Sequence, residues 1–255
     1  PKRDWSSDVC SSDLARKMLV LEGCAQPALA PATNVATARV LDRLGITLVR
    51  AREAGCCGAV SHHLDAQDEA LDFIRRTIDA WWPHIEQGAE AIVITASGCG
   101  AMVVDYGHLL AHDPAYADKA ARVSRLAKDV SEIIAAEKDR LKTLLKPAAA
   151  PVAFHPPCSL QHGLKLKGKV EALLTELGFV LTPVPDAHLC CGSAGTYSIL
   201  QPELSQQLLK NKLAALTTGA PYAIITANVG CQSHLQSAIA LPVTHWIETL
   251  DARLA

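Results

Sequence analysis

Two short stretches of this 255-residue chain decide its organisation. They read EAGCCGAVSHHL (residues 53–64) and HLCCGSAGTYSIL (residues 188–200), and in each a pair of adjacent cysteines is followed by glycine. A further cysteine lies 32 residues before each pair, and another lies 42 or 40 residues after it. The two sets are Cys24, Cys56, Cys57, Cys99 and Cys158, Cys190, Cys191, Cys231. This self-similarity indicates two copies of one structural unit.

The similarity extends beyond the cysteines. The run AEAIVITASGC, which ends at Cys99, resembles APYAIITANVGC, which ends at Cys231. Further along, DVSEII (residues 129–134) resembles HWIETL (residues 245–250). Agreement over so many positions is hard to attribute to chance, and the repeat covers nearly the whole chain.

Composition excludes several classes of protein. Apolar residues make up 49% of the chain and charged residues 20%, which is enough apolar material for a folded core and argues against disorder. The formal net charge of −2 lacks the basic excess that binding to a phosphate backbone needs, so we expect no nucleic-acid partner. The longest uncharged stretch, residues 213–247, is interrupted by Gly, Pro, Asn, Gln and His. We therefore expect no transmembrane segment.

The first fourteen residues, PKRDWSSDVCSSDL, show neither a helical nor a strand period. They resemble a translated sequencing adapter, so we expect residues 1–14, with Cys10, to be an artefact and the natural protein to extend further towards its N-terminus. The repeat predicts a first domain over residues 15–146 and a second over 150–255. Lysine, alanine and proline dominate residues 135–151, a composition typical of an interdomain linker.

Short apolar runs alternate with helical patterns in both copies. This alternation predicts an α/β fold of two homologous βαβ-type domains with parallel sheets, related by a pseudo-twofold. Pro83 is expected to end the long helix of the first copy. The predicted strands are 18–21, 46–49, 91–95, 152–154, 179–181 and 223–226, and the predicted helices are 33–44, 68–82, 169–177 and 202–216. Because ligands bind beyond the carboxyl ends of parallel strands, the cysteines that follow strands are candidate site residues.

Three kinds of chemistry could use these cysteines. Disulfides are disfavoured, since no signal peptide precedes the first globular segment and a reducing, cytoplasmic setting is expected. Zinc could be held by four thiolates, although the usual C-x₂-C spacing is missing. An iron–sulfur cluster fits the soft thiolate ligands and adjacent cysteines best, since neighbouring sulfurs can reach different irons. All eight repeated cysteines are candidate metal ligands, and His155, His162 and His188 could tune a cluster through hydrogen bonds.

The two patterns resemble the cysteine-rich CCG domain of heterodisulfide reductase subunits, lactate-utilisation proteins and glycolate oxidase iron–sulfur subunits. Wider segments, including LEGCAQPALAPATNVATARVLDRLGI, ASGCGAMVVDYG and ITANVGCQSHL, are similar to the last of these families over residues 18 to about 250. The general pattern ends in C-x-x-C, but here Met102 and His234 stand at the final positions. Met102 is expected to fill core space. His234 is a candidate auxiliary ligand, or else a hydrogen-bonded histidine at a helix start.

The resemblance to this family also implies a function. The chain would be an oxidoreductase subunit that does not act on the substrate itself and that binds [4Fe–4S]-type clusters at one or both cysteine sets. Flavin-containing partner subunits would oxidise glycolate to glyoxylate, and this subunit would pass electrons towards the quinone pool. The complex would place a cytoplasmic protein at the inner face of the membrane. The family's N-terminal ferredoxin-like domain has no counterpart in this sequence.

Two alternatives stay open. The chain could serve a lactate-utilisation or heterodisulfide-reductase-like redox complex, which contains such domains without attached ferredoxin motifs. A hypothesis of another class is a docking scaffold that binds zinc or no metal at all. Nothing in the sequence supports hydrolase chemistry, because no set of nucleophile, base and orienting residue is evident.

Overall fold

The computed structural model describes residues 14–148 and 150–255. They form two compact units: of the described residues, unit 1 holds 14–95 and 99–133, and unit 2 holds 96–98, 134–148 and 150–255. Unit 2 thus includes residues 134–146, ahead of the second predicted domain. Residues 1–13, with Cys10 and most of the expected artefact, lie outside the described residues.

Unit 1 is built on a four-stranded parallel sheet in the order β2-β1-β3-β4. The strands are β1 (Arg16–Leu21), β2 (Ile46–Arg50), β3 (Ile92–Ile94) and β4 (Ala127–Asp129). Val20 pairs with Arg50 on one side and with Val93 on the other, which fixes the register of the central strand. The parallel sheet expected from the alternating pattern is therefore present.

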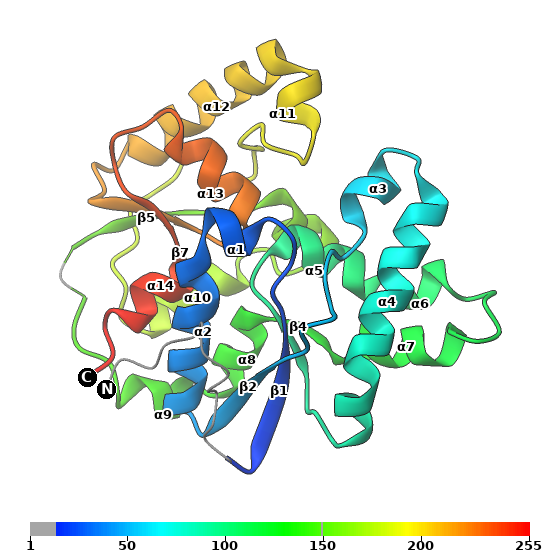
Figure 1. Ribbon diagram of the computed structural model, residues 1–255. Coiled ribbons are helices and arrows are strands. Elements are labelled where there is room, and N and C mark those ends of the chain that lie inside the picture. Colours follow the sequence, from blue (N-terminus) through cyan, green and yellow to red (C-terminus); the bar gives the residue numbers. More distant parts are fainter. Residues whose placement is uncertain (1–13, 149) are drawn as a thin grey trace. The chain divides into compact units, whose positions relative to one another are not determined.

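Both faces of this sheet are covered, so its strands read as apolar runs. Side chains alternate along each strand, and Leu19 and Leu21 join a core cluster with Ile74 and Ile78 of the long helix α4, while Val20 points to the opposite face. In Figure 1, α2 and α4 lie on opposite sides of the sheet. The helices are α1 (Gln26–Leu29), α2 (Pro31–Arg43), α3 (Ala59–His63), α4 (Gln67–Glu86), α5 (Ser97–Val104), α6 (Tyr106–Leu109), α7 (Ala117–Leu126) and α8 (Val130–Ala136).

The prediction that Pro83 ends the long helix of unit 1 is wrong, because α4 continues to Glu86. A proline inside a helix removes one backbone hydrogen bond and crowds the preceding turn. Here the turn beyond Pro83 contains Ile85, which is buried in the core cluster. The carbonyl oxygen of Pro83 also accepts a hydrogen bond from the amide of Gln87, 3.2 Å away. The packing of Ile85 therefore outweighs the local cost.

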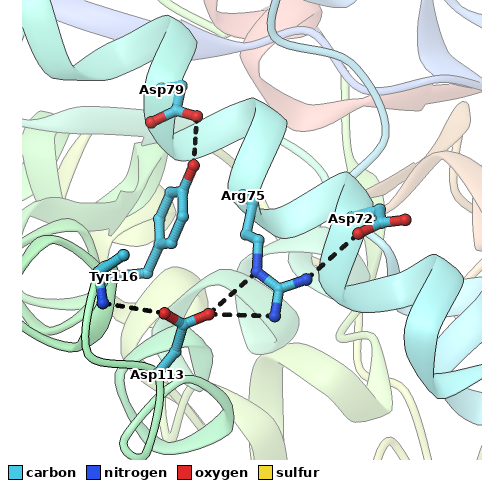
Figure 2. A network of polar contacts seen from close by, with 6 residues as sticks. Asp72, Arg75, Asp79, Asp113 and Tyr116 are labelled. Atoms are coloured by element: carbon cyan, nitrogen blue, oxygen red, sulfur yellow. Dashed lines mark hydrogen bonds and ion pairs between the residues drawn. The ribbon is translucent and has the colours of Figure 1, made fainter.

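Unit 1 contains an insertion, α6 and α7, that has no counterpart in the second copy. A polar network joins α4 to the loop before α7 (Figure 2). Arg75 lies between Asp113 and Asp72, with nitrogen–oxygen distances of 3.0 and 3.2 Å. The hydroxyl of Tyr116 donates to Asp79, 2.5 Å away. These exposed or half-buried contacts hold the insertion against the outer face of α4.

Unit 2 repeats the same topology with one strand fewer. Its parallel sheet has the order β5-β6-β7, built from β5 (Val152–His155), β6 (Ala223–Thr226) and β7 (Val243–His245). The strand predicted over residues 179–181 is reduced to one parallel bridge between Val152 and Leu181, where unit 1 has the whole of β2. Only Leu181 pairs here, because Val180 is exposed and the prolines at positions 183 and 185 cannot donate to a strand ladder.

The helices of unit 2 surround its sheet as those of unit 1 do. They are α9 (Lys138–Lys142), the π-helix η1 (Ser159–Gly163), α10 (Lys169–Glu176), α11 (Tyr197–Leu200), α12 (Pro202–Thr217), α13 (Val229–Gln236) and α14 (Trp246–Asp251). The predicted linker is partly wrong: α8 ends at Ala136 and α9 follows, with Leu141 fully buried. Lysine and alanine are good helix formers, which explains helix where a linker was expected.

Two strands were missing from the sequence-based prediction. They are β4 and β7, each three residues long with a half-buried polar residue, Lys128 or Thr244, at the centre. Both lead directly into a helix, α8 or α14, at the place where DVSEII resembles HWIETL. The expected α/β class and its two homologous, parallel-stranded copies are thus confirmed.

Candidate metal centres

The folds of both units bring the cysteines to the carboxyl ends of parallel strands. In unit 1, Cys24 follows β1, and Cys99 lies in the first turn of α5, which follows β3. In unit 2, Cys158 follows β5, and Cys231 lies in the first turn of α13, which follows β6. Each CCG triplet occupies the loop before the next helix. This edge is where open α/β sheets form their sites.

The four thiols of unit 1 form a chain of pairwise contacts. Side-chain hydrogen bonds connect Cys24 with Cys56, Cys56 with Cys57, and Cys57 with Cys99. The pKa of Cys24 is raised chiefly by its contact with Cys56, with burial adding to the effect. Thiols that crowd together cannot all ionise without a cation, so the cluster is suited to a metal.

The four thiols of unit 2 form a similar chain, from Cys158 through Cys190 and Cys191 to Cys231. The pKa of Cys190 is lowered, first by a hydrogen bond with Cys158, and the pKa of buried Cys231 is lowered, first by a hydrogen bond with Cys191. The neighbourhood of His155 lowers both values further. The pKa of Cys158 and that of Cys191 are raised by the same contacts with Cys190. Two of the four thiols are thus favoured as thiolates.

The glycine of each CCG triplet is required by the backbone. Gly58 and Gly192 have φ values of +83° and +93°, in the left-handed region that glycine adopts without strain. A Cβ on Gly58 would stand 2.9 Å from the carbonyl oxygen of Ala70, and one on Gly192 would stand 2.4 Å from that of Ser205. The glycine amides also point at sulfur, since they donate to the Sγ of Cys56 (3.4 Å) and Cys190 (3.3 Å) respectively. Such amides favour a bound thiolate.

Buried polar side chains fasten the CCG loop of unit 1. The hydroxyl of Tyr106 donates to the carbonyl oxygen of Cys57, 2.9 Å away, and that of Thr77 donates to the carbonyl oxygen of Cys56, 3.3 Å away. The pKa of Tyr106 is raised well above its usual value, first by burial and then by the nearby thiols. These bonds hold both sulfurs in place from the side of the core.

A different pair of groups fastens the CCG loop of unit 2. Ser205 donates to the carbonyl oxygen of Gly192 at 2.8 Å. The buried ammonium of Lys212 donates to the carbonyl oxygen of Ala187 at 2.7 Å, in the segment that leads to the cysteine pair. Burial lowers the pKa of Lys212, and the charges of Cys191, Cys190 and Cys231 oppose that effect. Unit 2 therefore has a buried amino group that interacts electrostatically with its thiols.

Lys212 escaped the sequence-based interpretation, which considered cysteines, histidines and Met102 but not this lysine. The repeat does contain a signal for it. The buried positions of the helix after the CCG loop include Ala70, Ile74 and Thr77 in unit 1 and Ser205, Leu209 and Lys212 in unit 2. Lys212 therefore occupies the place of Thr77, and a lysine at a buried position of a helix is a candidate functional residue.

One histidine joins the thiols of unit 2. The ligand atoms of His155, Cys191 and Cys231 all lie within 4.8 Å of one another, and all three residues are buried. The two other histidines named as tuning candidates, His162 and His188, are exposed. Of the three, then, the structure brings only His155 to the cysteine set.

The residues at the final motif positions lie elsewhere. Met102 is buried in the apolar core cluster of unit 1. The Nε2 atom of His234 lies 3.2 Å from the hydroxyl oxygen of Ser205. Since that hydroxyl donates to Gly192, Nε2 is the donor of the bond between His234 and Ser205. His234 thus supports the CCG loop through Ser205.

The residues of both sites fit a thiolate-bound metal or cluster. Each site offers four thiols that are linked by pairwise contacts and a glycine amide that donates to sulfur. Soft sulfur ligands of this kind select iron–sulfur clusters, zinc or copper(I) over hard cations. Partial burial of the sulfurs would shield a cluster from water, which is one of the factors that set its potential.

Comparison with known proteins places this chemistry in a family. The model of the cysteine-rich domain called CCG matches residues 18–104 and 152–236, so each copy matches once. The chain is 57% identical over 239 residues to the glycolate oxidase iron-sulfur subunit of Escherichia coli (strain K12), which covers 94% of this chain and 58% of that protein. It is 28% identical to the probable glycolate oxidase iron-sulfur subunit of Bacillus subtilis (strain 168), over 89% of this chain and 50% of that protein.

For a second group of relatives, the match with this chain extends along nearly the whole length of each relative. The chain is 30% identical over 238 residues to lactate utilization protein A of Bacillus thuringiensis (strain Al Hakam), which covers 87% of this chain and 93% of that protein. By contrast, the chain spans between half and three-fifths of the two glycolate oxidase subunits. The repeated cysteine pattern, the repeated parallel sheets and the matching residues agree: this chain belongs to the CCG cysteine-rich domain family and contains two copies of its domain.

Proposed function

We propose that this chain is the electron-transfer part of an oxidoreductase complex that oxidises glycolate to glyoxylate. In this role it relays electrons from flavin-containing subunits towards the quinone pool and does not act on the substrate itself. The observation that supports the proposal most strongly is the meeting of four thiols at the same edge of the sheet in each unit. The 57% identity to a glycolate oxidase iron-sulfur subunit supports the choice of complex.

We propose that each cysteine set binds one cluster of the [4Fe–4S] type. The ligands in unit 1 would be Cys24, Cys56, Cys57 and Cys99, and those in unit 2 would be Cys158, Cys190, Cys191 and Cys231. Such a cluster supplies one-electron chemistry when bound. The chain itself contributes loops of fixed shape, glycine amides that donate to sulfur, and in unit 2 a buried ammonium.

Exposed apolar side chains beside the second cysteine loop support a partner subunit. Leu189 precedes the cysteine pair, while Ile199, Leu200 and Leu204 lie on α11 and α12, and all four are exposed. Apolar groups that gather at a surface commonly mark a protein interface. We assign this surface to a flavin-containing subunit, which must approach a cluster closely to deliver electrons.

Among the described residues, no helix has the length and apolarity that crossing a bilayer requires.

The test is anaerobic reconstitution of the full chain with iron and sulfide, followed by iron and sulfide analysis and electron paramagnetic resonance. We expect two clusters per chain and a reducible, sulfur-ligated signal. Protein that stays free of iron after reconstitution, or that binds zinc stoichiometrically without a redox signal, would support the docking-scaffold alternative and overturn the proposal.

A second candidate is supported by the second group of relatives. The chain is 30% identical over 238 residues to a lactate utilization protein A. The same electron relay could therefore serve a complex that oxidises lactate. Reduction of the reconstituted chain by its co-purified partner subunits, with glycolate or lactate as the donor, separates the two candidates. Glycolate-dependent reduction is expected, and reduction by lactate alone would reassign the complex.

A further inference from the structure

His155 is a buried histidine whose ring has no ordinary hydrogen-bonding partner. It is the last residue of β5, and its side chain is 1% exposed. Neither Nδ1 nor Nε2 has a nitrogen or oxygen partner among the described residues, and the ring contacts the thiol of Cys231. Burying a polar group without a partner is costly, so such groups call for an explanation. The backbone of His155 is well anchored, since Thr226 donates to its carbonyl oxygen at 3.0 Å.

The ring points towards the cysteines because of its register on the strand. Side chains two residues apart lie on the same face of a strand, so His155 shares a face with Ala153. Ala153 belongs to the core cluster of unit 2 that also contains Cys191 and Cys231. The ring and these two thiols have their ligand atoms within 4.8 Å of one another. This limit includes the contacts that Cys231 makes with Cys191 and with the ring, and it also fits three atoms that surround a common ion.

Unit 1 has no imidazole at this position. The residue three positions before Cys24 is Leu21, just as His155 stands three positions before Cys158. Leu21 is buried in the core cluster of unit 1, next to Cys57. The fold thus tolerates a leucine here, and the histidine of unit 2 is not needed to build the sheet.

We propose that His155 is a ligand of the metal centre in unit 2, together with Cys191 and Cys231. The centre of unit 2 then has mixed nitrogen and sulfur ligands, whereas that of unit 1 has sulfur ligands alone. On binding, the thiols release their protons and the imidazole binds in its neutral form through one ring nitrogen. In this assignment His155 takes the place of one of the four thiols named above for unit 2. Exchange of an anionic sulfur for a neutral nitrogen raises the reduction potential of a cluster, so unit 2 has the higher potential. The inference rests on the proposed function only in requiring a bound metal.

The experiment compares two variants. His155→Leu introduces the leucine that unit 1 has at the corresponding position, and the control His162→Gln replaces an exposed histidine seven residues further along the chain. Each full-length protein is labelled with ¹⁵N-histidine, reconstituted with iron and sulfide, and examined by pulsed electron paramagnetic resonance. A directly coordinated nitrogen is expected in the wild type and in His162→Gln and is absent from His155→Leu. Redox titration should show a more negative potential for one centre of His155→Leu and no change for the other.

A second probe removes the dependence on cluster assembly. Each protein is loaded with Co²⁺ alone, and the hyperfine-shifted imidazole N–H resonance of a coordinated histidine is sought by NMR. If iron does not assemble but this resonance is present and is lost in His155→Leu, the proposed function fails and the ligand assignment holds. If iron assembles without a nitrogen coupling, or with one that persists in His155→Leu, the ligand assignment fails alone. Failure to bind either metal overturns both.

The variant His155→Cys guards against misfolding of His155→Leu. It keeps a soft ligand at the same place, so it should retain iron while losing the nitrogen coupling. Retention of the nitrogen coupling in His155→Cys would contradict the assignment as directly as its retention in His155→Leu.

Discussion

Gly192 and Ser205 are in close backbone contact: a Cβ on Gly192 would stand 2.4 Å from the carbonyl oxygen of Ser205. The same two residues are joined by a hydrogen bond, because the hydroxyl of Ser205 donates to the carbonyl oxygen of Gly192 at 2.8 Å. Through this contact α12 presses against the loop that presents Cys190 and Cys191. The CCG triplet is therefore a backbone requirement as well as a ligand motif.

Replacing Gly192 with alanine should destabilise the protein by about 3 kcal/mol or more. A positive φ costs a non-glycine residue about 1–2 kcal/mol, and forcing an atom into a packed position adds about 1–3 kcal/mol. Chemical denaturation monitored by circular dichroism measures the loss. The matched control is Gly195→Ala in the same loop, where φ is +61° but no atom lies within 4 Å of the added Cβ. Equal losses in the two variants would contradict the role assigned to the Ser205 contact.

Cys57→Ser and Cys191→Ser should each reduce bound iron to about half of the wild-type amount. Each variant removes one buried thiol from a different set, and a hydroxyl is a poor substitute for a soft thiolate ligand. Iron and sulfide analysis of the reconstituted chain measures the effect. Met102→Leu serves as control, since Met102 packs in the core of unit 1 and this exchange is well tolerated. Loss of iron in Met102→Leu would instead make Met102 a ligand.

Lys212→Met should lower the reduction potential of the centre in unit 2 and leave that of unit 1 unchanged. The buried ammonium interacts electrostatically with Cys190, Cys191 and Cys231, and a nearby positive charge favours the state with one more electron. Potentiometric titration of both centres measures the shift. Lys210→Met, an exposed position on the same helix, should change neither potential. Shifts of equal size in both centres, or in both variants, would show that Lys212 has no specific electrostatic role.

Asp129→Asn should remove a pH dependence of stability between about pH 4 and pH 6. Asp129 is buried, its Oδ1 accepts a hydrogen bond from the amide of Ser131 at 2.9 Å, and burial raises its pKa from 3.8 to about 6. An acid with a raised pKa binds more protons in the folded state than in the unfolded state. Its contribution to stability is therefore complete below pH 3.8 and is lost as the pH rises through about 6.

Between about pH 4 and pH 6 the free energy of unfolding of the wild type should fall by at most about 3 kcal/mol, because one pKa unit corresponds to about 1.4 kcal/mol. Urea denaturation at several pH values measures it as the difference between the wild type and Asp129→Asn. Asp118→Asn, at an exposed site on α7, should follow the wild type throughout. A difference between wild type and Asp129→Asn that stays constant from pH 4 to pH 7 would show that Asp129 does not titrate in this range.

The predictable parts of the fold are those in which local pattern and tertiary packing agree. The strand predicted over 46–49 is found as Ile46–Arg50, and the helix predicted over 202–216 as Pro202–Thr217. Prediction failed where packing overrode local preference. Buried Ile85 carries α4 past Pro83, and Leu181 makes only one bridge although its neighbours read as a strand. The strands β4 and β7 were too short and too polar to show a pattern.

The candidate sites divide in the same way. The spacing of the cysteines in the sequence by itself determined that the chain has two copies of one unit, and the alternating pattern determined a parallel α/β class. Periodicity is a property of local stretches, so the sequence can show it directly. Whether distant side chains meet depends on how helices cross over the sheet and which strand face each side chain occupies. Only the tertiary structure could therefore place Cys24 against Cys56, turn His155 towards Cys231 and bury Lys212 beside the second cysteine loop.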